Sequence, residues 1–67
     1  MALCVTLIGC RNRILDSDNF QSGCKGIRDA IARTFGLDDA DDCIRWEYGQ
    51  VRTDGIQGVI VKIERLI

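Results

Sequence analysis

Two groups of aspartates are the residues of this chain with the clearest chemical potential. The first group lies in residues 15–20 (LDSDNF) and contains Asp16 and Asp18, and the second lies in residues 36–42 (GLDDADD). Carboxylate oxygens are the ligands that hard cations such as Mg²⁺ prefer in proteins. The two groups therefore predict a magnesium site, and a site that cuts phosphodiesters is the most specific function that this pattern indicates.

The same aspartates also have simpler roles to fill. Asp18 or Asn19 is suited to cap the helix that follows, and the second group is suited to a solvated loop. Two details favour a metal. Asp16 is not needed for that cap, and the second group follows the carboxyl end of a helix, where the helix dipole disfavours negative charge that a cation would offset. An EF-hand is a poor match, because Phe20 stands where its loop needs an oxygen ligand.

A helix must separate the two acidic groups. Apolar side chains recur every three or four residues between them, which predicts an amphipathic helix over residues 19–35, ended by Gly36. The apolar residues at this spacing are Phe20, Cys24, Ile27, Ile31 and Phe35.

Three further segments have the patterns of strands. Residues 3–8 are a short apolar run, and residues 44–48 and 59–63 alternate between apolar and charged side chains. The turn residues between the last two segments predict that these two strands form a hairpin. The expected fold is α+β, a single domain over residues 1–67 with a three-stranded sheet in β-α-β-β order and one amphipathic helix packed on one face.

Length and cysteine content restrict the class of protein. A chain of 67 residues is marginally stable as a monomer, so oligomerisation is the expected source of further stability. The four cysteines have no C-x-x-C spacing and no histidine accompanies them, which argues against zinc. Residues 1–10 are too short to span a bilayer and lack the basic start of a secretory signal. We expect a cytoplasmic protein, without membrane association, whose thiols are reduced and mostly buried.

The positive charge is local rather than general. The net charge is −1, whereas dedicated DNA-binding domains are usually basic. Arg11 and Arg13 precede the first acidic group, and Lys25 and Arg28 lie on the predicted helix. These four residues are the candidate DNA contacts, and their arrangement suits metal-bridged binding to phosphates rather than tight non-specific binding.

The surface of the predicted helix carries two further features. Lys25 is either a solvated lysine that pairs with Asp29 one turn away or an ammonium that neutralises charge on a transferring phosphate. Gly23 and Gly26 lower helix propensity, and their lack of side chains would let a second helix approach closely.

The length of the helix determines how the acidic groups can combine. A helix over residues 19–35 is about 25 Å long at 1.5 Å per residue, so its two ends cannot share one metal within a monomer. Two chains with antiparallel helices around a two-fold axis would bring Asp16 and Asp18 of one chain beside Asp38 and Asp39 of the other. The resulting pair of equivalent sites suits symmetric cutting of a four-way DNA junction.

With these residues in place, the chain resembles the RusA-type crossover junction endodeoxyribonucleases, a family common in prophages. The matching text is LDSDNF at residues 15–20, GLDDAD at residues 36–41, and strands like those at residues 44–48 and 59–63, and the similarity covers about residues 3–66. The resemblance implies a homodimer that resolves Holliday junctions in recombination and repair, encoded by a phage or prophage and working in the bacterial cytoplasm. It also implies Mg²⁺ as the cofactor, with Mn²⁺ as an alternative. By position, the metal ligands are Asp16, Asp18 and Asp39, and the assisting lysine is Lys25.

An alternative function stays open at this point. The family's lysine can lie one turn closer to the first acidic group, where this chain has Ser22, and family members often carry an upstream strand and basic loop that this sequence lacks. These departures and the acidic net charge are consistent with a catalytically inactive or repurposed dimeric module that binds DNA or protein. An ordinary acidic surface without any metal is a third interpretation.

Overall fold

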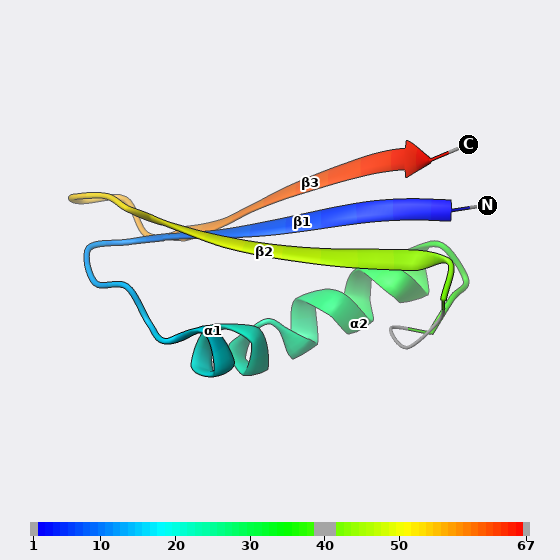
Figure 1. Cartoon of the computed structure of the whole chain (residues 1–67), viewed down its shortest axis with the longest axis horizontal. Coiled ribbons are helices and arrows are strands. Elements are labelled where there is room, and N and C mark those ends of the chain that lie inside the picture. The colour runs from blue at the N-terminus through cyan, green and yellow to red at the C-terminus, as the bar shows by residue number, and fades with distance from the viewer. Residues whose placement is uncertain (1, 39–41, 67) are drawn as a thin grey trace.

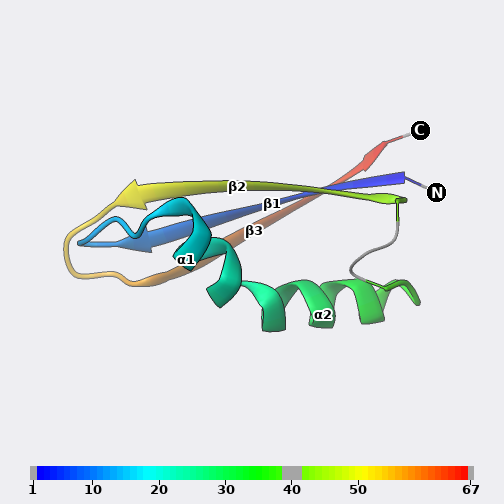
Figure 2. The ribbon, with the colours of Figure 1, turned by 60° about the horizontal axis from the view of Figure 1, so that its bottom comes forward.

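The structure is a computed structural model and describes residues 2–38 and 42–66. The elements along the chain are β1 (Ala2–Arg11), α1 (Ser17–Gly23), α2 (Lys25–Thr34), β2 (Ile44–Arg52) and β3 (Gly58–Leu66). The strands form one mixed three-stranded sheet, and both helices lie on the same face of it (Figures 1 and 2). The predicted α+β class and three-stranded sheet are confirmed.

The order of the strands in the sheet differs from the prediction. β1 lies in the centre, pairs in parallel with β2 (Leu3 opposite Ile44) and pairs antiparallel with β3 (Val5 opposite Ile63). The predicted hairpin between the last two strands is therefore wrong. The physical reason is the composition of β1, whose apolar run is buried best with a strand on each side, and Val5 and Leu7 are 0% exposed in this position.

The connection from β2 to β3 crosses the end of β1 instead of turning back on itself. Thr53 N donates a hydrogen bond of 2.9 Å to Arg11 O, which ties the start of this loop to the last residue of β1. Gly55 then turns the chain with φ of 92°, a left-handed conformation that favours glycine. The chain thereby reaches the side of β1 opposite to β2, where β3 begins (Figure 1).

The helical segment starts earlier than predicted and is broken once. It begins at Ser17 and divides at Cys24 into α1 and α2, so the single predicted helix is two helices. The break follows Gly23, a poor helix former, and the Cys24 N–H is shared between the carbonyls of Phe20 and Gln21. The predicted helix end is confirmed, because Gly36 has φ of 71° and Leu37 N donates to Ala32 O, as in a Schellman motif.

The hydrophobic core lies between the helices and the half of the sheet formed by β1 and β2. Its buried members come from β1, both helices and the start of β2, and Trp46 and Tyr48 pack against them as predicted. These buried members are Val5, Leu7, Phe20, Cys24, Ala32 and Ile44. On the predicted apolar helix face, Ile27 and Ile31 are half-buried, whereas Phe35 is exposed at the end of the helical segment.

The four cysteines are all thiols, but they differ in exposure. Cys4 and Cys24 are buried, Cys10 is half-buried and Cys43 is exposed, so the prediction of buried thiols holds for two of them. Burial raises the pKa of the Cys24 thiol, and the nearby Arg28 guanidinium partly opposes this shift. Cys24 is thus an inert core residue. Within the described chain, no helix is long and apolar enough to cross a membrane.

The contact between Gly9 and Phe20 gives a test of this packing. A Cβ atom at Gly9 would lie 2.5 Å from Phe20 Cε1, so we expect Gly9→Ala to lower the free energy of unfolding by about 1–3 kcal/mol. Gly26→Ala is the control, because a Cβ there meets nothing within 4 Å and should raise the free energy of unfolding by about 0.5–1 kcal/mol. Urea denaturation followed by tryptophan fluorescence measures both. A Gly9→Ala protein as stable as the wild type would contradict this packing.

Candidate functional site

Asp16 is the residue that begins the helical segment. Its backbone is extended (φ −66°, ψ 158°), and its Oδ1 accepts a hydrogen bond of 2.9 Å from Asn19 N. Its Oδ2 accepts a second bond, of 2.8 Å, from the Asn19 side-chain amide. The predicted cap at Asp18 or Asn19 is therefore wrong, because the helix starts before both residues. The inference that Asp16 is not needed as a cap is wrong for the same reason.

The loop before Asp16 is held to the sheet by one side chain. Gln50 on β2 accepts a hydrogen bond of 3.0 Å from Leu15 N through Oε1 and donates one of 2.8 Å to Leu15 O through Nε2. This pair of bonds holds the residue next to Asp16 at a defined distance from β2. Sequence reasoning missed Gln50. The available signal was its place in the alternation of Ile44, Trp46 and Tyr48, where a polar residue facing the helices needs a partner.

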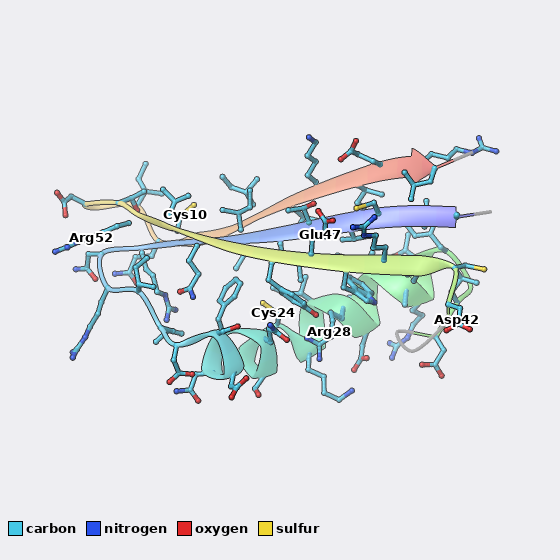
Figure 3. The ribbon with its side chains drawn as sticks, in the orientation of Figure 1. Cys10, Cys24, Arg28, Asp42, Glu47 and Arg52 are labelled. Atoms are coloured by element: carbon cyan, nitrogen blue, oxygen red, sulfur yellow. The ribbon has the colours of Figure 1, made fainter. Side chains whose placement is uncertain are left out.

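Asp18 lines an open polar cleft of about 370 Å³ together with Gln21, Ser22, Arg28 and Tyr48. Arg28 joins the walls of this cleft, because its Nη1 donates to Gln21 O at 2.7 Å and to the Tyr48 hydroxyl at 3.1 Å. The Arg28 guanidinium carbon also lies 5.9 Å from the centre of the Tyr48 ring. The side chain of Arg28 lies beside Cys24 on the sheet-facing side of the helices (Figure 3). A carboxylate and a guanidinium thus share one solvent-accessible cleft.

The other predicted basic residues lie in different surroundings. Lys25 Nζ lies 3.5 Å from Asp29 Oδ2, as the simpler interpretation predicted, and both side chains are well exposed. An exposed pair of this kind contributes little to stability. Arg13 is exposed in the loop after β1, and Arg11 is half-buried at the end of that strand.

The second acidic group begins at the far end of the helices. Asp38 is exposed and lines a cleft of about 240 Å³ with Asp29, Arg33 and Leu37. The predicted ligand Asp39 and its neighbour Asp41 lie outside the described residues.

Residues 15–20 and the described part of the second group, residues 36–38, lie at opposite ends of the helical layer (Figure 1). Among residues 2–38 and 42–66, no three histidine, cysteine or acidic side chains lie close enough to hold a metal ion together. The oxygens of Asp16 and Asp18 are of the type that Mg²⁺ binds, and each carboxylate oxygen of Asp16 keeps a lone pair beyond its bond to Asn19. Asp16 and Asp18 thus carry the oxygen type that Mg²⁺ binds, but among the described residues they do not complete a donor set.

The chain matches no protein-family model, no curated protein and no solved structure. Its function is therefore inferred from its own residues, together with the resemblance in residues 15–20 and 36–41 described above.

Asp16 variants separate the capping role from any role in metal binding. We expect Asp16→Ala to lower the free energy of unfolding by about 0.5–2 kcal/mol, because both bonds to Asn19 are lost. Asp16→Asn should leave stability nearly unchanged, since asparagine caps as well as aspartate. Chemical denaturation in the presence of a chelator measures both variants. Equal stability of Asp16→Ala and the wild type would contradict the cap.

Proposed function

We propose that this chain is a subunit of a magnesium-dependent, structure-specific DNA endonuclease that resolves Holliday junctions in recombination and repair. The observation that carries the proposal is the open cleft that Asp18, two residues after Asp16, and Arg28 line together. Carboxylates suit a hard cation and a guanidinium suits a phosphate. Their combination on an exposed surface is what metal-assisted cutting of a phosphodiester requires.

Each residue has a role in this proposal. Asp16, Asp18 and Asp39 hold Mg²⁺, or Mn²⁺ in its place. When bound, the ion supplies an activated water and neutralises charge on the phosphate. Lys25 and Arg28 face the phosphates near the cut, and the exposed loop residue Arg13, with Arg11 beside it, extends the contact along the DNA backbone. Gln50 acts indirectly by holding the loop that presents Asp16.

The proposal includes a homodimer. Support comes from Asp16, which caps the start of α1, and Asp38, which follows the end of α2, because each end of the helical layer of a single chain then carries only part of a donor set. In a two-fold dimer with antiparallel helices, each site takes Asp16 and Asp18 from one chain and Asp39 from the other, with Asp38 or Asp41 orienting the ligands. Two equivalent sites then cut two strands of a four-way junction.

A metal titration tests the site before the DNA. We expect Mg²⁺ to shift the backbone amide signals of residues 16–19 in NMR spectra of the wild type, and the same titration of Asp18→Asn to lose most of this shift. Purified protein with Mg²⁺ should nick a synthetic four-way junction in symmetric positions, while Asp18→Asn should not. Asp54→Asn, in the loop between β2 and β3, is the matched control and should behave as the wild type. Equal cutting of linear duplex would contradict specificity for junctions.

The effect of Asp39 on association tests the shared site. Repulsion between the acidic groups should weaken the dimer without metal, and a divalent cation that binds the dimer should tighten it. We expect Asp39→Asn to dimerise at least as strongly as the wild type in a chelator and to lose the tightening by Mg²⁺. Sedimentation of both proteins with and without Mg²⁺ measures this. A wild-type dimer that is indifferent to Mg²⁺ would contradict a shared site.

One observation favours the alternative, a dimeric module that binds DNA or protein without cutting. Both carboxylate oxygens of Asp16 are engaged with Asn19, so this residue has a complete structural role without a metal. Ser22, where the resembled family can carry its lysine, lines the cleft beside Asp18. Binding of a four-way junction without cleavage in Mg²⁺ or Mn²⁺ would favour this module over the nuclease.

A further inference from the structure

The outer edge of the sheet at β3 is unusually apolar for a surface. Five large apolar side chains of β3 are between 39% and 55% exposed, and the described part of the chain places no strand beside its outer edge. These residues are Val59, Ile60, Val61, Ile63 and Leu66. We propose that β3 pairs antiparallel with β3 of a second copy of this chain, so that two sheets join into one of six strands.

The backbone determines which residues can form the new hydrogen bonds. Leu3 N donates to Cys43 O and Arg11 O accepts from Thr53 N, so the odd-numbered residues of β1 direct their backbone groups toward β2. The even-numbered residues of β1 consequently face β3, where Thr6 is opposite Lys62. Even-numbered residues of β3 are therefore bonded to β1, and the odd-numbered residues, such as Val61 and Ile63, direct their N–H and C=O groups outward.

The division between odd- and even-numbered residues of β3 determines how the two copies are arranged. Only odd residues of one β3 can bond odd residues of the other, and paired residues direct their side chains to the same face of a sheet. The two helical layers must then lie on the same face of the six-stranded sheet and run antiparallel. The helices of the two copies then run antiparallel, as in the proposed dimer, but the strands supply the contact and each helical layer stays over its own β1 and β2.

The charges on β3 select one register. Like charges directly opposite each other destabilise a strand pair, which disfavours the registers that place Lys62 opposite Lys62 or Glu64 opposite Glu64 of the second copy. With Ile63 opposite Ile63 of the second copy, Lys62 lies opposite Glu64 twice, and Ile60 lies opposite Leu66 twice. Lys62 Nζ already lies 3.6 Å from Glu64 Oε1 within one strand, so the dimer would hold an alternating square of four charges.

The remaining surfaces are poorer candidates for self-association. On the opposite edge strand, β2, the exposed large apolar residue among the described residues is Val51. Within the described residues, α1 and α2 expose no large apolar side chain. The first half of β3 also lacks the usual protection of an edge, since it contains no proline and the three charged residues of the strand all follow Val61.

The register can be tested with charge reversals. We expect Lys62→Glu and Glu64→Lys each to weaken the dimer about tenfold, because two attractive cross-strand pairs become repulsive. An equimolar mixture of the two variants should regain dimerisation, as each reversed charge then meets an opposite charge on the other chain. Recovery on mixing cannot arise from the Lys62–Glu64 pair within one strand. Sedimentation equilibrium without metal or DNA measures all of these proteins.

The same face of the sheet offers a matched control. Arg45 and Glu47 on β2 form an equivalent exposed pair at 3.2 Å, so Arg45→Glu should leave dimerisation unchanged. A wild type that stays monomeric at millimolar concentration, an unaltered Lys62→Glu dimer or a mixture without recovery would overturn the proposal. The β3-mediated dimer requires neither metal nor DNA. A protein that dimerises in this way without cutting junctions would therefore contradict only the proposed nuclease function.

Cross-linking gives a second measurement that does not depend on charge. Directly opposed residues of a hydrogen-bonded antiparallel pair have Cα atoms about 5.5 Å apart, within the range of a disulfide. In a background with Cys10→Ser and Cys43→Ser, Ile63→Cys should therefore form a covalent dimer on oxidation. Val61→Cys, which lies opposite Arg65 of the second copy in this register, should not. Cross-linking through Val61→Cys instead of Ile63→Cys would overturn the register.

Discussion

The burial of β1 is the constraint on which the rest of the structure depends. In a chain of this size, only a strand with neighbours on both edges and helices on one face can be fully removed from solvent. β1 takes this place, with Leu3, Val5 and Leu7 at 3% exposure or less. β2 and β3 must then lie on opposite sides of β1, and the two helices must cover the face that carries these side chains. The exposed outer edge of β3 follows from the same arrangement.

The acidic start of α1 is positioned by contacts from distant parts of the chain. Gln50 bonds both backbone groups of Leu15, and Arg28 bonds the Gln21 carbonyl and the Tyr48 hydroxyl. Tyr48 in turn meets the Phe20 ring edge-on, with ring centres 6.3 Å apart. The strand β2 thus holds both the loop that precedes α1 and the helical turns that follow the start of α1. The carboxylates of Asp16 and Asp18 are exposed, but the backbone that carries them is well supported.

Asp16 and Asp18 differ in their roles within this supported backbone. Asp16 has a structural role that is complete without a metal, whereas Asp18 lies in the first turn of α1 and lines a cleft with Arg28. Asp38 lines a different cleft, with Asp29, Arg33 and Leu37, toward the end of α2. A function that needs carboxylates from both ends therefore needs two chains. The proposed self-association links the small size of the chain, the apolar edge of β3 and the proposed cutting of paired DNA strands.

The sequence by itself determined the presence of three strands and one helical segment, but not the division of that segment at Cys24, because periodicity and end signals act within a few residues. The strands, the helical segment and its end at Gly36 were predicted from such local patterns. The strand order and the partners of Gln50 were decided only by the tertiary structure, whereas the cap at Asp16 is a local contact between residues three positions apart. A hairpin and a central β1 satisfy the same alternation of side chains, and only competition for burial selects between them. The hydrogen bonds between Gln50 and Leu15 join residues 35 positions apart, and no local sequence pattern can predict a contact over this separation.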